Sequence, residues 1–281
     1  MDNKREKKII IKAKSGFQLI NWKEIIEYKD LLYFLVHKEV TILYKQTILG
    51  FSWAIIRPFF TMVIFSIIFG NLAKVPSDGI PYPLFSYIAL VPWTYFSTAM
   101  TKSSLSLVGS AGTFTKVYFP RLVIPITSVI SGLVDFFISF TIILLLMIWY
   151  GVTPTLNIII LPYLILIMFV FSSGIGLMLS SLAIQYRDIR HGMHFISQLL
   201  MYATPVVWPV SLLADKMGPN AIYIYSFYPM AGVIEGFRAA LIGVNPMPWL
   251  MIINGSISSL IVFLFGAYYF KNKEYLFADV A

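Results

Sequence analysis

Asp135 is the residue best placed to carry chemistry inside the apolar part of this sequence. It is the one acid deep within a long apolar run, which extends from about Val123 to Tyr150. An ionisable group at such depth is costly and marks a candidate functional site. Asp135 could relay protons, meet a cation or hydrogen-bond a neighbouring helix. Because no other buried charge accompanies it, we expect structural pairing rather than a proton-coupled carrier.

A second group, Asp188, His191 and His194, has the helical i, i+3, i+6 spacing that could present three metal ligands. The chain has no cysteine that could complete a zinc site, so we expect solvated residues and no bound metal. The Gly-x-x-x-x-Gly-Lys-Ser/Thr loop that cradles nucleotide phosphates is also missing. We therefore predict no catalytic residues and no cofactor on this chain, and place any ATP and Mg²⁺ on a partner.

The composition surrounding these groups indicates an integral membrane protein. Hydrophobic residues make up 58% of the chain and charged residues 12%, whereas soluble domains carry about 25% charge. The net charge is +8, and 11 of the 21 Lys and Arg residues lie at or before Arg57. Positive charge stays on the cytoplasmic side of a membrane, beside anionic lipid. The basic excess thus predicts orientation, and not nucleic-acid binding.

Six apolar stretches are long enough to span a bilayer, which takes about 20 helical residues. They cover residues 52–72, 84–107, 123–150, 158–184, 195–213 and 249–270. With both termini cytoplasmic, 18 of the 21 Lys and Arg residues lie inside, as the positive-inside rule requires. We predict an all-α protein of the cytoplasmic (inner) membrane. It has a cytoplasmic segment 1–46, a transmembrane domain 47–273 and a cytoplasmic tail 274–281.

The segment from Ala214 to Pro248 is apolar, but a full crossing is disfavoured. Pro229 lies in its middle, and Glu235 and Arg238 would each cost about 2.5–3.5 kcal/mol at the bilayer centre. We predict two short helices over 214–245 that enter the outer leaflet, return, and act as a gate over a pore or lateral opening. Glu235 and Arg238 are three residues apart and can pair on one helix face.

An amphipathic helix is predicted over Trp22–Leu43, before the first span. Its apolar residues fall on one face, with charged and polar residues opposite, which is typical of a helix lying in the inner interface. Such a helix either anchors the N-terminal segment or also receives a cytoplasmic partner. The apolar face comprises Trp22, Ile25, Leu32, Val36, Val40 and Leu43.

Five aromatic residues flank the helix-breaking Pro92, Pro205 and Pro209. Most aromatics of this chain sit near predicted span ends, as interface belts do. Aromatic faces can also stack on the apolar side of sugar rings, which would let a long sugar chain slide through a channel. On this hypothesis the channel aromatics are Trp93, Tyr95, Phe96, Tyr202 and Trp208.

Several short motifs follow one another along the chain. They are Tyr44–Gly50 with Trp53-Ala54 and Arg57-Pro58, Val91–Phe96, Thr115–Arg121, Tyr186–Ile189, Thr204–Val206, Tyr228–Met230 and Gly236–Arg238. In this order and spacing, they resemble the ABC-2-type permeases that export O-antigen, capsule and teichoic acid (the Wzm and TagG types). The resemblance covers residues 44–270, and where that family usually has Asn before a proline this chain has Tyr228.

The resemblance implies a permease subunit that exports a polysaccharide linked to a polyprenyl diphosphate. Two copies of this chain would form the channel, and two copies of an ATP-binding ABC subunit would dock beneath it. At headgroup depth, Arg57, Lys116 and Arg121 could hold the lipid diphosphate, since Arg and Lys both suit phosphate, or contact ordinary phospholipid. The partner-coupling residues would be Lys38, Lys45, Gly109, Thr115, Lys116, Tyr118, Arg187, Asp188 and Arg190.

Two other functions remain open at this point. One is an ABC-2 exporter of drugs or other lipids, which shares the fold. The other is a membrane transferase acting on a polyprenyl-linked sugar. A transferase needs acids or a metal site at the membrane face, and the sequence holds only scattered acids there, so it is the weaker alternative.

Overall fold

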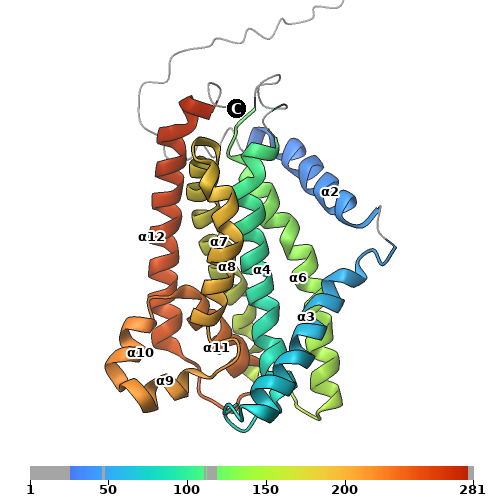
Figure 1. Cartoon of the computed structure of the whole chain (residues 1–281), viewed down its shortest axis with the longest axis vertical. Coiled ribbons are helices and arrows are strands. Elements are labelled where there is room, and N and C mark those ends of the chain that lie inside the picture. Colours follow the sequence, from blue (N-terminus) through green and yellow to red (C-terminus); the bar gives the residue numbers. More distant parts are fainter. Residues whose placement is uncertain (1–25, 46–47, 111, 113–118, 278–281) are drawn as a thin grey trace, which may run out of the picture.

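The computed structural model describes residues 26–45, 48–110, 112 and 119–277, and the regular elements within these ranges are all helical (Figure 1). The all-α prediction is therefore confirmed for this part of the chain. In chain order the elements are α2 (Lys29–Lys45), α3 (Ser52–Phe65), the π-helix η1 (Ser66–Leu72), α4 (Tyr82–Gly109), α6 (Val123–Trp149), the 3-10 helix η2 (Leu156–Ile160), α7 (Leu161–Gln185), α8 (Arg187–Ala203), α9 (Val210–Met217), α10 (Pro219–Tyr225), α11 (Pro229–Leu241), α12 (Trp249–Lys273) and the 3-10 helix η3 (Glu274–Leu276).

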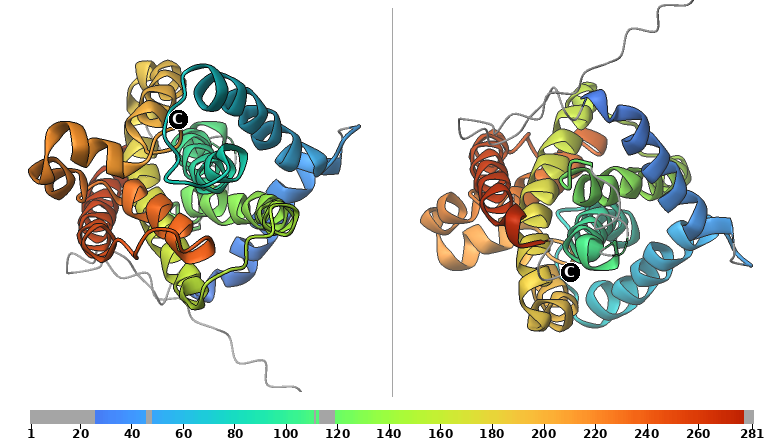
Figure 2. Two further views of the ribbon diagram at one scale, coloured as in Figure 1. Left: turned by 90° about the horizontal axis from the view of Figure 1, so that it is seen from below. Right: turned by 90° about the horizontal axis from the view of Figure 1, so that it is seen from above.

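The long helices run alternately down and up the molecule in Figure 1. α3 with η1 descends, α4 ascends, α6 descends, α7 ascends, α8 descends and α12 ascends. The short helices α9, α10 and α11 gather at the lower end. Viewed along the bundle, α4 lies near the middle (Figure 2), and it contacts α3, α6, α7 and α11.

Four of these passes are long and apolar enough to cross a membrane: Ser52–Leu72, Val123–Trp149, Leu156–Gln185 and Trp249–Lys273. They correspond to the first, third, fourth and sixth predicted spans. α4 is long, with 28 residues, but it carries many serines and threonines as well as Lys102. Most of its residues are buried by neighbouring helices, so its polar groups face protein. The described chain is thus a multi-pass helical membrane protein.

The limits of the fifth predicted span, 195–213, are wrong. α8 begins at Arg187, directly after a one-residue break at Tyr186, and it ends at Ala203. The helix stops there because Pro205 disfavours helical backbone in the preceding residue and supplies no N–H. A new helix, α9, starts only after Pro209. The residues directly before the predicted start at 195 therefore form the first half of α8.

The lower end of the bundle contains three short helices where two were predicted. α9 and α10 lie at the periphery, whereas α11 packs against α4, α7 and α12 (Figure 1). Every residue of α11, from Pro229 to Leu241, is buried. A short helix enclosed on all sides fits the rule that interrupted helices at membrane depth lie against protein.

α7 and α12 pack unusually closely because glycines face each other across their contact. A Cβ atom added at Gly174 would lie 2.6 Å from the backbone of Phe263, and one at Gly266 would collide with the carbonyl oxygen of Gly174. Small residues allow helix backbones to approach in membranes, where van der Waals packing replaces the hydrophobic drive. This close contact fixes α12 against the centre of the bundle.

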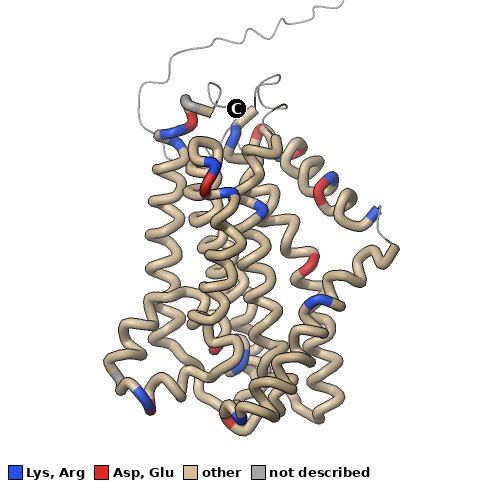
Figure 3. The backbone as a smooth tube through the Cα atoms, viewed as in Figure 1, with Lys and Arg blue, Asp and Glu red and all other residues tan. Residues whose placement is uncertain are grey.

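α2 lies diagonally on the flank of the bundle and packs on α6 (Figures 1 and 2). Its predicted apolar positions Leu32, Val36, Val40 and Leu43 are half-buried, whereas His37 on the polar face is exposed. None of its residues is fully buried. Residues 22–25 of the predicted helix lie outside the described ranges. Figure 3 shows Lys and Arg mostly in the upper half of the molecule, at the end where α12 finishes.

Candidate functional site

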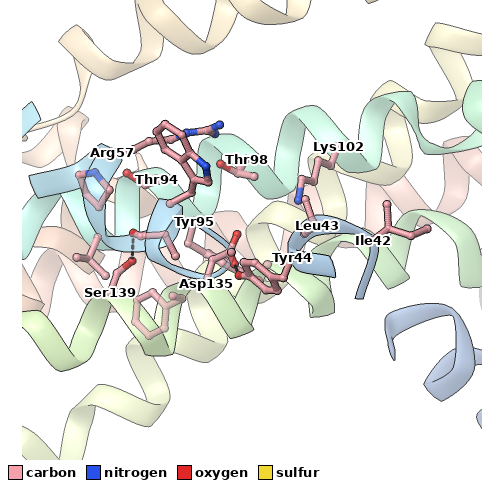
Figure 4. A pocket seen from close by; sticks show the side chains of 17 residues that line it. Ile42, Leu43, Tyr44, Arg57, Thr94, Tyr95, Thr98, Lys102, Asp135 and Ser139 are labelled. Carbon is pink, nitrogen blue, oxygen red and sulfur yellow. Dashed lines mark hydrogen bonds between the residues drawn. The ribbon is translucent and has the colours of Figure 1, made fainter. Parts of the chain in front are cut away.

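A cavity of about 410 Å³ lies where α2 and α3 diverge from the flank of α4 and α6. α2 and α3 lie on one side of the cavity, and α4 and α6 lie on the other (Figures 2 and 4). The cavity is lined by Ile42, Leu43 and Tyr44 of α2, Trp53, Ala54, Arg57 and Pro58 of α3, Val91, Thr94, Tyr95, Thr98 and Lys102 of α4, and Gly132, Asp135, Phe136 and Ser139 of α6, together with Gly50.

Asp135 faces this cavity and accepts a hydrogen bond from the hydroxyl of Tyr44 (Figure 4). The pairing expected for a buried acid is present, and its partner is the end of the amphipathic helix α2. Nearby, the Ser139 hydroxyl donates to the carbonyl of Ala54 at 2.8 Å. These bonds join α6 to α2 and to α3 rather than to the core of the bundle.

Two cations share the cavity with Asp135. Arg57 lies with its guanidinium 5.5 Å from the ring centre of Trp53, and Lys102 extends from α4 into the same space (Figure 4). Within the described part of the chain Lys102 forms no ion pair, although Glu39 and Arg57 act on it electrostatically. Our sequence reasoning did not select Lys102. The sequence nevertheless carries an indication, because Lys102 is a charged residue inside the apolar stretch 84–107, and such a charge is rare without a function.

A second cavity of about 520 Å³ adjoins the first toward the upper end and shares Ile42, Leu43 and Lys102 with it. Lys38 and Glu39 of α2 line it on one side, and serines and threonines of α4 and α6 line it on the other. The Ser128 hydroxyl donates to the Glu39 carboxylate at 3.3 Å. Glu39, which was not among the predicted residues, therefore forms a second tether between α2 and α6.

At the lower end, Glu235 and Arg238 form the predicted ion pair, with a nitrogen–oxygen distance of 2.8 Å. Both side chains are buried. Arg238 also donates to the carbonyl of Val206 at 3.1 Å, and its guanidinium lies 3.5 Å from the ring centre of Phe85. Glu235 accepts from the backbone N–H of Val210 at 3.2 Å. The pair thus connects α11 to α4 and to the α8–α9 linker.

The α8–α9 linker, residues 204–209, is held by tyrosines as well. The Tyr82 hydroxyl donates to the carbonyl of Val207 at 2.7 Å, and the hydroxyls of Tyr228 and Thr204 share a hydrogen bond of 2.8 Å. Burial raises the pKa of Tyr228 to about 12, against a smaller lowering by Thr204, so its hydroxyl stays neutral. The tyrosine that stands where the resembled family has Asn therefore has a defined structural contact.

The five channel-aromatic candidates do not lie together. Phe96 stacks on Phe171 at a centroid distance of 5.2 Å, and Trp93 packs beside it, so both are core residues of the single chain. Tyr95 is also buried, although it lines the Asp135 cavity, and Trp208 is half-buried. Tyr202 is the exposed member of the set. The rings of α4 are buried because α4 runs through the middle of the bundle.

The partner-coupling candidates that the structure describes lie at the upper end or on α2. Arg187, Asp188 and Arg190 are exposed in the first turn of α8, and Arg190 donates to the carbonyl of Ala183 at the end of α7. The remaining members of this set divide as follows: Lys38, Lys45 and Gly109 are exposed, whereas Thr115, Lys116 and Tyr118 lie outside the described residues.

The structure does not bring the lipid-diphosphate candidates into one cavity. Arg57 lines the Asp135 cavity. Arg121 instead donates to the carbonyl of Glu274 and lies 6.0 Å from the ring centre of Phe277, which fastens the start of α6 to the chain's last described helix. The third candidate, Lys116, is outside the described residues. Asp188, His191 and His194 all lie exposed on α8.

The alternating helices, four of them with the length and apolarity of membrane spans, define a multi-pass membrane protein. Residues 30–242 match the family model described as ABC-2 type transporter. This match covers most of the chain, from α2 to the end of α11. The chain therefore belongs to the ABC-2 type transporter family, whose members are transport permeases rather than enzymes.

Three relatives with assigned transport functions are similar to this chain over most of its length. The chain is 29% identical over 218 residues to the O-antigen export system permease protein RfbA of Myxococcus xanthus, covering 77% of this chain and 82% of that protein. A Klebsiella pneumoniae protein of the same name is 27% identical over 253 residues, covering 89% and 95%. The polysialic acid transport protein KpsM of Escherichia coli is 23% identical over 238 residues, covering 82% and 84%.

Proposed function

We propose that this chain is the membrane permease subunit of an ABC transporter that exports a polysaccharide of the O-antigen or capsule type. The observation that carries the proposal is the near full-length similarity to permeases named for O-antigen export, one of which is matched over 95% of its length. The similarity to a polysialic acid transport protein supports the same class of cargo. The absence of a nucleotide-binding loop from the sequence agrees with ATP being bound by a partner.

The cargo is a finished glycan carried on a polyprenyl diphosphate in the cytoplasmic membrane. Arg57, Lys116 and Arg121 are the candidates for contact with the diphosphate, because guanidinium and ammonium groups pair well with phosphate oxygens. Of these, Arg57 has structural support, since it shares a cavity with a second cation, Lys102. This cavity is the first place to test for the substrate headgroup.

The assembly contains two copies of this chain and two copies of an ATP-binding ABC subunit that holds ATP and Mg²⁺. The ATP-binding subunit docks on the polar face of α2, on the α4–α6 connection and on the first turn of α8. Exposed Lys38, Arg187 and Asp188 support this assignment, because they present charge at the same end of the bundle. Motion of the ATP-binding subunit would then reach the bundle through α2 and α8.

The permease crosses the cytoplasmic membrane six times, with both termini in the cytoplasm. The alternating directions of the long helices (Figure 1) support this topology, with α4 and α8 as the second and fifth crossings. Lys and Arg lie mostly toward one end (Figure 3), which is then the cytoplasmic end. Helices α9 to α11 form the re-entrant gate on the outer side, with Pro229, Glu235 and Arg238 at its centre.

The experiment is deletion of this chain in its native cell, combined with co-purification of the neighbouring ATP-binding subunit. We expect glycan to accumulate inside the cell, surface polysaccharide to disappear, and the two subunits to purify as one complex. A stable complex with active ATP hydrolysis but normal surface glycan would move the cargo to drugs or other lipids. Failure to bind any ATP-binding subunit would contradict the proposal altogether.

A further inference from the structure

We propose that the cavity between α2, α3, α4 and α6 is a binding site for a phosphorylated sugar, namely the first sugar of the glycan with its attached phosphate. Lys102 and Arg57 would pair with the phosphate, and Asp135 would accept hydrogen bonds from the sugar hydroxyls. The inference rests on the proposed function and deepens it, because it assigns the end of the lipid-linked glycan to particular side chains.

The charged residues that line the cavity favour the binding of an anion. Its charged lining residues are two cations, Lys102 and Arg57, and one carboxylate, Asp135, whose oxygen is already engaged by Tyr44. Lys102 is half-buried on α4 and forms no ion pair with any described residue. Burying a charge is costly unless it is paired, so an anionic ligand is the natural counter-charge. Glu39, in the adjoining cavity, acts on Lys102 electrostatically but forms no ion pair with it, and its carboxylate accepts a hydrogen bond from Ser128.

The polar groups beside the cations suit a sugar. Thr94, Thr98 and Lys102 follow one another at intervals of four residues, which places them on one face of α4. Figure 4 shows these three side chains along one wall and Asp135 opposite. Hydroxyls and a carboxylate can exchange hydrogen bonds with sugar hydroxyls, and the Trp53 ring offers an aromatic face. A simple anion would need none of these groups.

The size of the cavity decides how much of the glycan it holds. A volume of about 410 Å³ lies toward the small end of ligand pockets, which range over about 300–1,000 Å³. The site can therefore hold the terminal sugar and its phosphate, and not a long stretch of the chain. A sugar hydroxyl that bonds Asp135 competes with the hydroxyl of Tyr44. Binding of the sugar therefore alters the hydrogen bond that holds the end of α2.

The test uses the full complex of permease and ATP-binding subunit in lipid nanodiscs. Three probes are compared: a polyprenyl diphosphate carrying one sugar, the same diphosphate without sugar, and phosphatidylglycerol. Binding is measured for the wild type, for Lys102→Gln and for Asp135→Asn. Lys216→Gln and Asp215→Asn, both exposed at the opposite end, are the matched controls.

We expect the sugar-bearing diphosphate to bind most tightly to the wild type. Lys102→Gln should weaken both diphosphates by about tenfold to a hundredfold, the usual worth of a charge-assisted hydrogen bond. Asp135→Asn should weaken only the sugar-bearing probe, because an amide oxygen accepts from sugar hydroxyls less strongly than a carboxylate, whereas loss of a negative charge does not weaken binding of a phosphate. Equal binding of all three probes, unchanged binding to Lys102→Gln, or equal weakening of both diphosphates by Asp135→Asn would overturn the inference.

A second measurement does not depend on those variants. Because the chain contains no cysteine, Thr98→Cys places a single thiol in the cavity. The sugar-bearing diphosphate should protect this thiol from a maleimide, whereas phosphatidylglycerol should not, and a thiol at Lys216→Cys should react at the same rate throughout. Protection by phosphatidylglycerol as well would assign the cavity to ordinary lipid. A transporter that exports glycan but shows no protection would contradict this inference alone, whereas normal surface glycan after deletion would contradict the proposed function.

Discussion

At the scale of single residues, the Glu235–Arg238 pair has the most extensive contacts. It joins α11 to α4 through Phe85 and to the α8–α9 linker through Val206. Breaking a buried pair by removing one partner is expensive, because the other charge is left buried without compensation. The pair therefore fixes the position of α11 relative to the bundle.

We predict that Arg238→Met destabilises the protein by about 3–5 kcal/mol, because it leaves Glu235 charged and enclosed. The double variant Glu235→Leu with Arg238→Met should recover part of this loss, since no buried charge then remains. Both are compared by the midpoint of thermal unfolding in detergent. A double variant less stable than Arg238→Met would contradict the electrostatic explanation.

The Tyr44–Asp135 hydrogen bond gives a second prediction at this scale. Tyr44→Phe removes the donor and leaves the partly buried Asp135 carboxylate without it, at a cost of about 1–3 kcal/mol. Thermal unfolding of the purified chain measures the change. Tyr33→Phe is the control on the same helix, because the Tyr33 side chain is exposed, and it should have no effect. Equal effects of the two variants would show that the hydrogen bond adds nothing to stability.

At the scale of helices, the α7–α12 contact depends on glycine. Gly174→Ala should cost about 1–3 kcal/mol, because the new methyl group would overlap the backbone of Phe263. Gly192→Ala in α8 is the matched control, since a Cβ there meets only the end of the Ile196 side chain at 4.0 Å. This control should be neutral or slightly stabilising, as alanine favours helix. Similar losses in both variants, measured by thermal unfolding, would contradict the close-packing argument.

The helix α2 is tethered to the bundle by few side chains, which suits an element that moves. Tyr44 bonds Asp135, Glu39 bonds Ser128, and no residue of α2 is fully buried. We predict that joining Glu39→Cys to Ser128→Cys with a short thiol cross-linker abolishes export while leaving the complex intact. A cleavable cross-linker should restore export on reduction, and each single-cysteine variant should export normally. Undiminished export by the cross-linked protein would mean that α2 stays fixed during transport.

At the scale of the whole molecule, the proposed topology of six crossings with both termini in the cytoplasm predicts which residues a membrane-impermeant thiol reagent can reach. Lys74→Cys and Lys216→Cys should react in intact cells, because the proposed topology places them on the side opposite the cytoplasm. Arg187→Cys and Lys271→Cys should react only after the membrane is opened. The cysteine-free chain supplies a clean background. Labelling of Lys271→Cys in intact cells would require an odd number of crossings between Arg187 and Lys271, where the proposed topology has two.

The sequence alone determined the class of protein and much of its helical layout. The apolar run predicted at 123–150 is the helix Val123–Trp149, because a stretch this long and apolar is stable only as a buried or membrane helix. The spacing of Glu235 and Arg238 predicted their pairing, since residues three apart share a helix face. The limits of the fifth span were missed because Pro205 and Pro209 outweighed the apolar pattern around them.

The tertiary structure alone decided which side chains meet. Tyr44 and Asp135 are 91 residues apart in sequence, and no local pattern shows that α2 lies on α6. The rotation of each helix about its axis is set by packing, so the burial of Phe96 inside the bundle could not be predicted in advance. Composition and periodicity fix what a helix is, whereas the neighbours it packs against fix where each of its faces points, and the cavity that unites Lys102, Arg57 and Asp135 depends on the second.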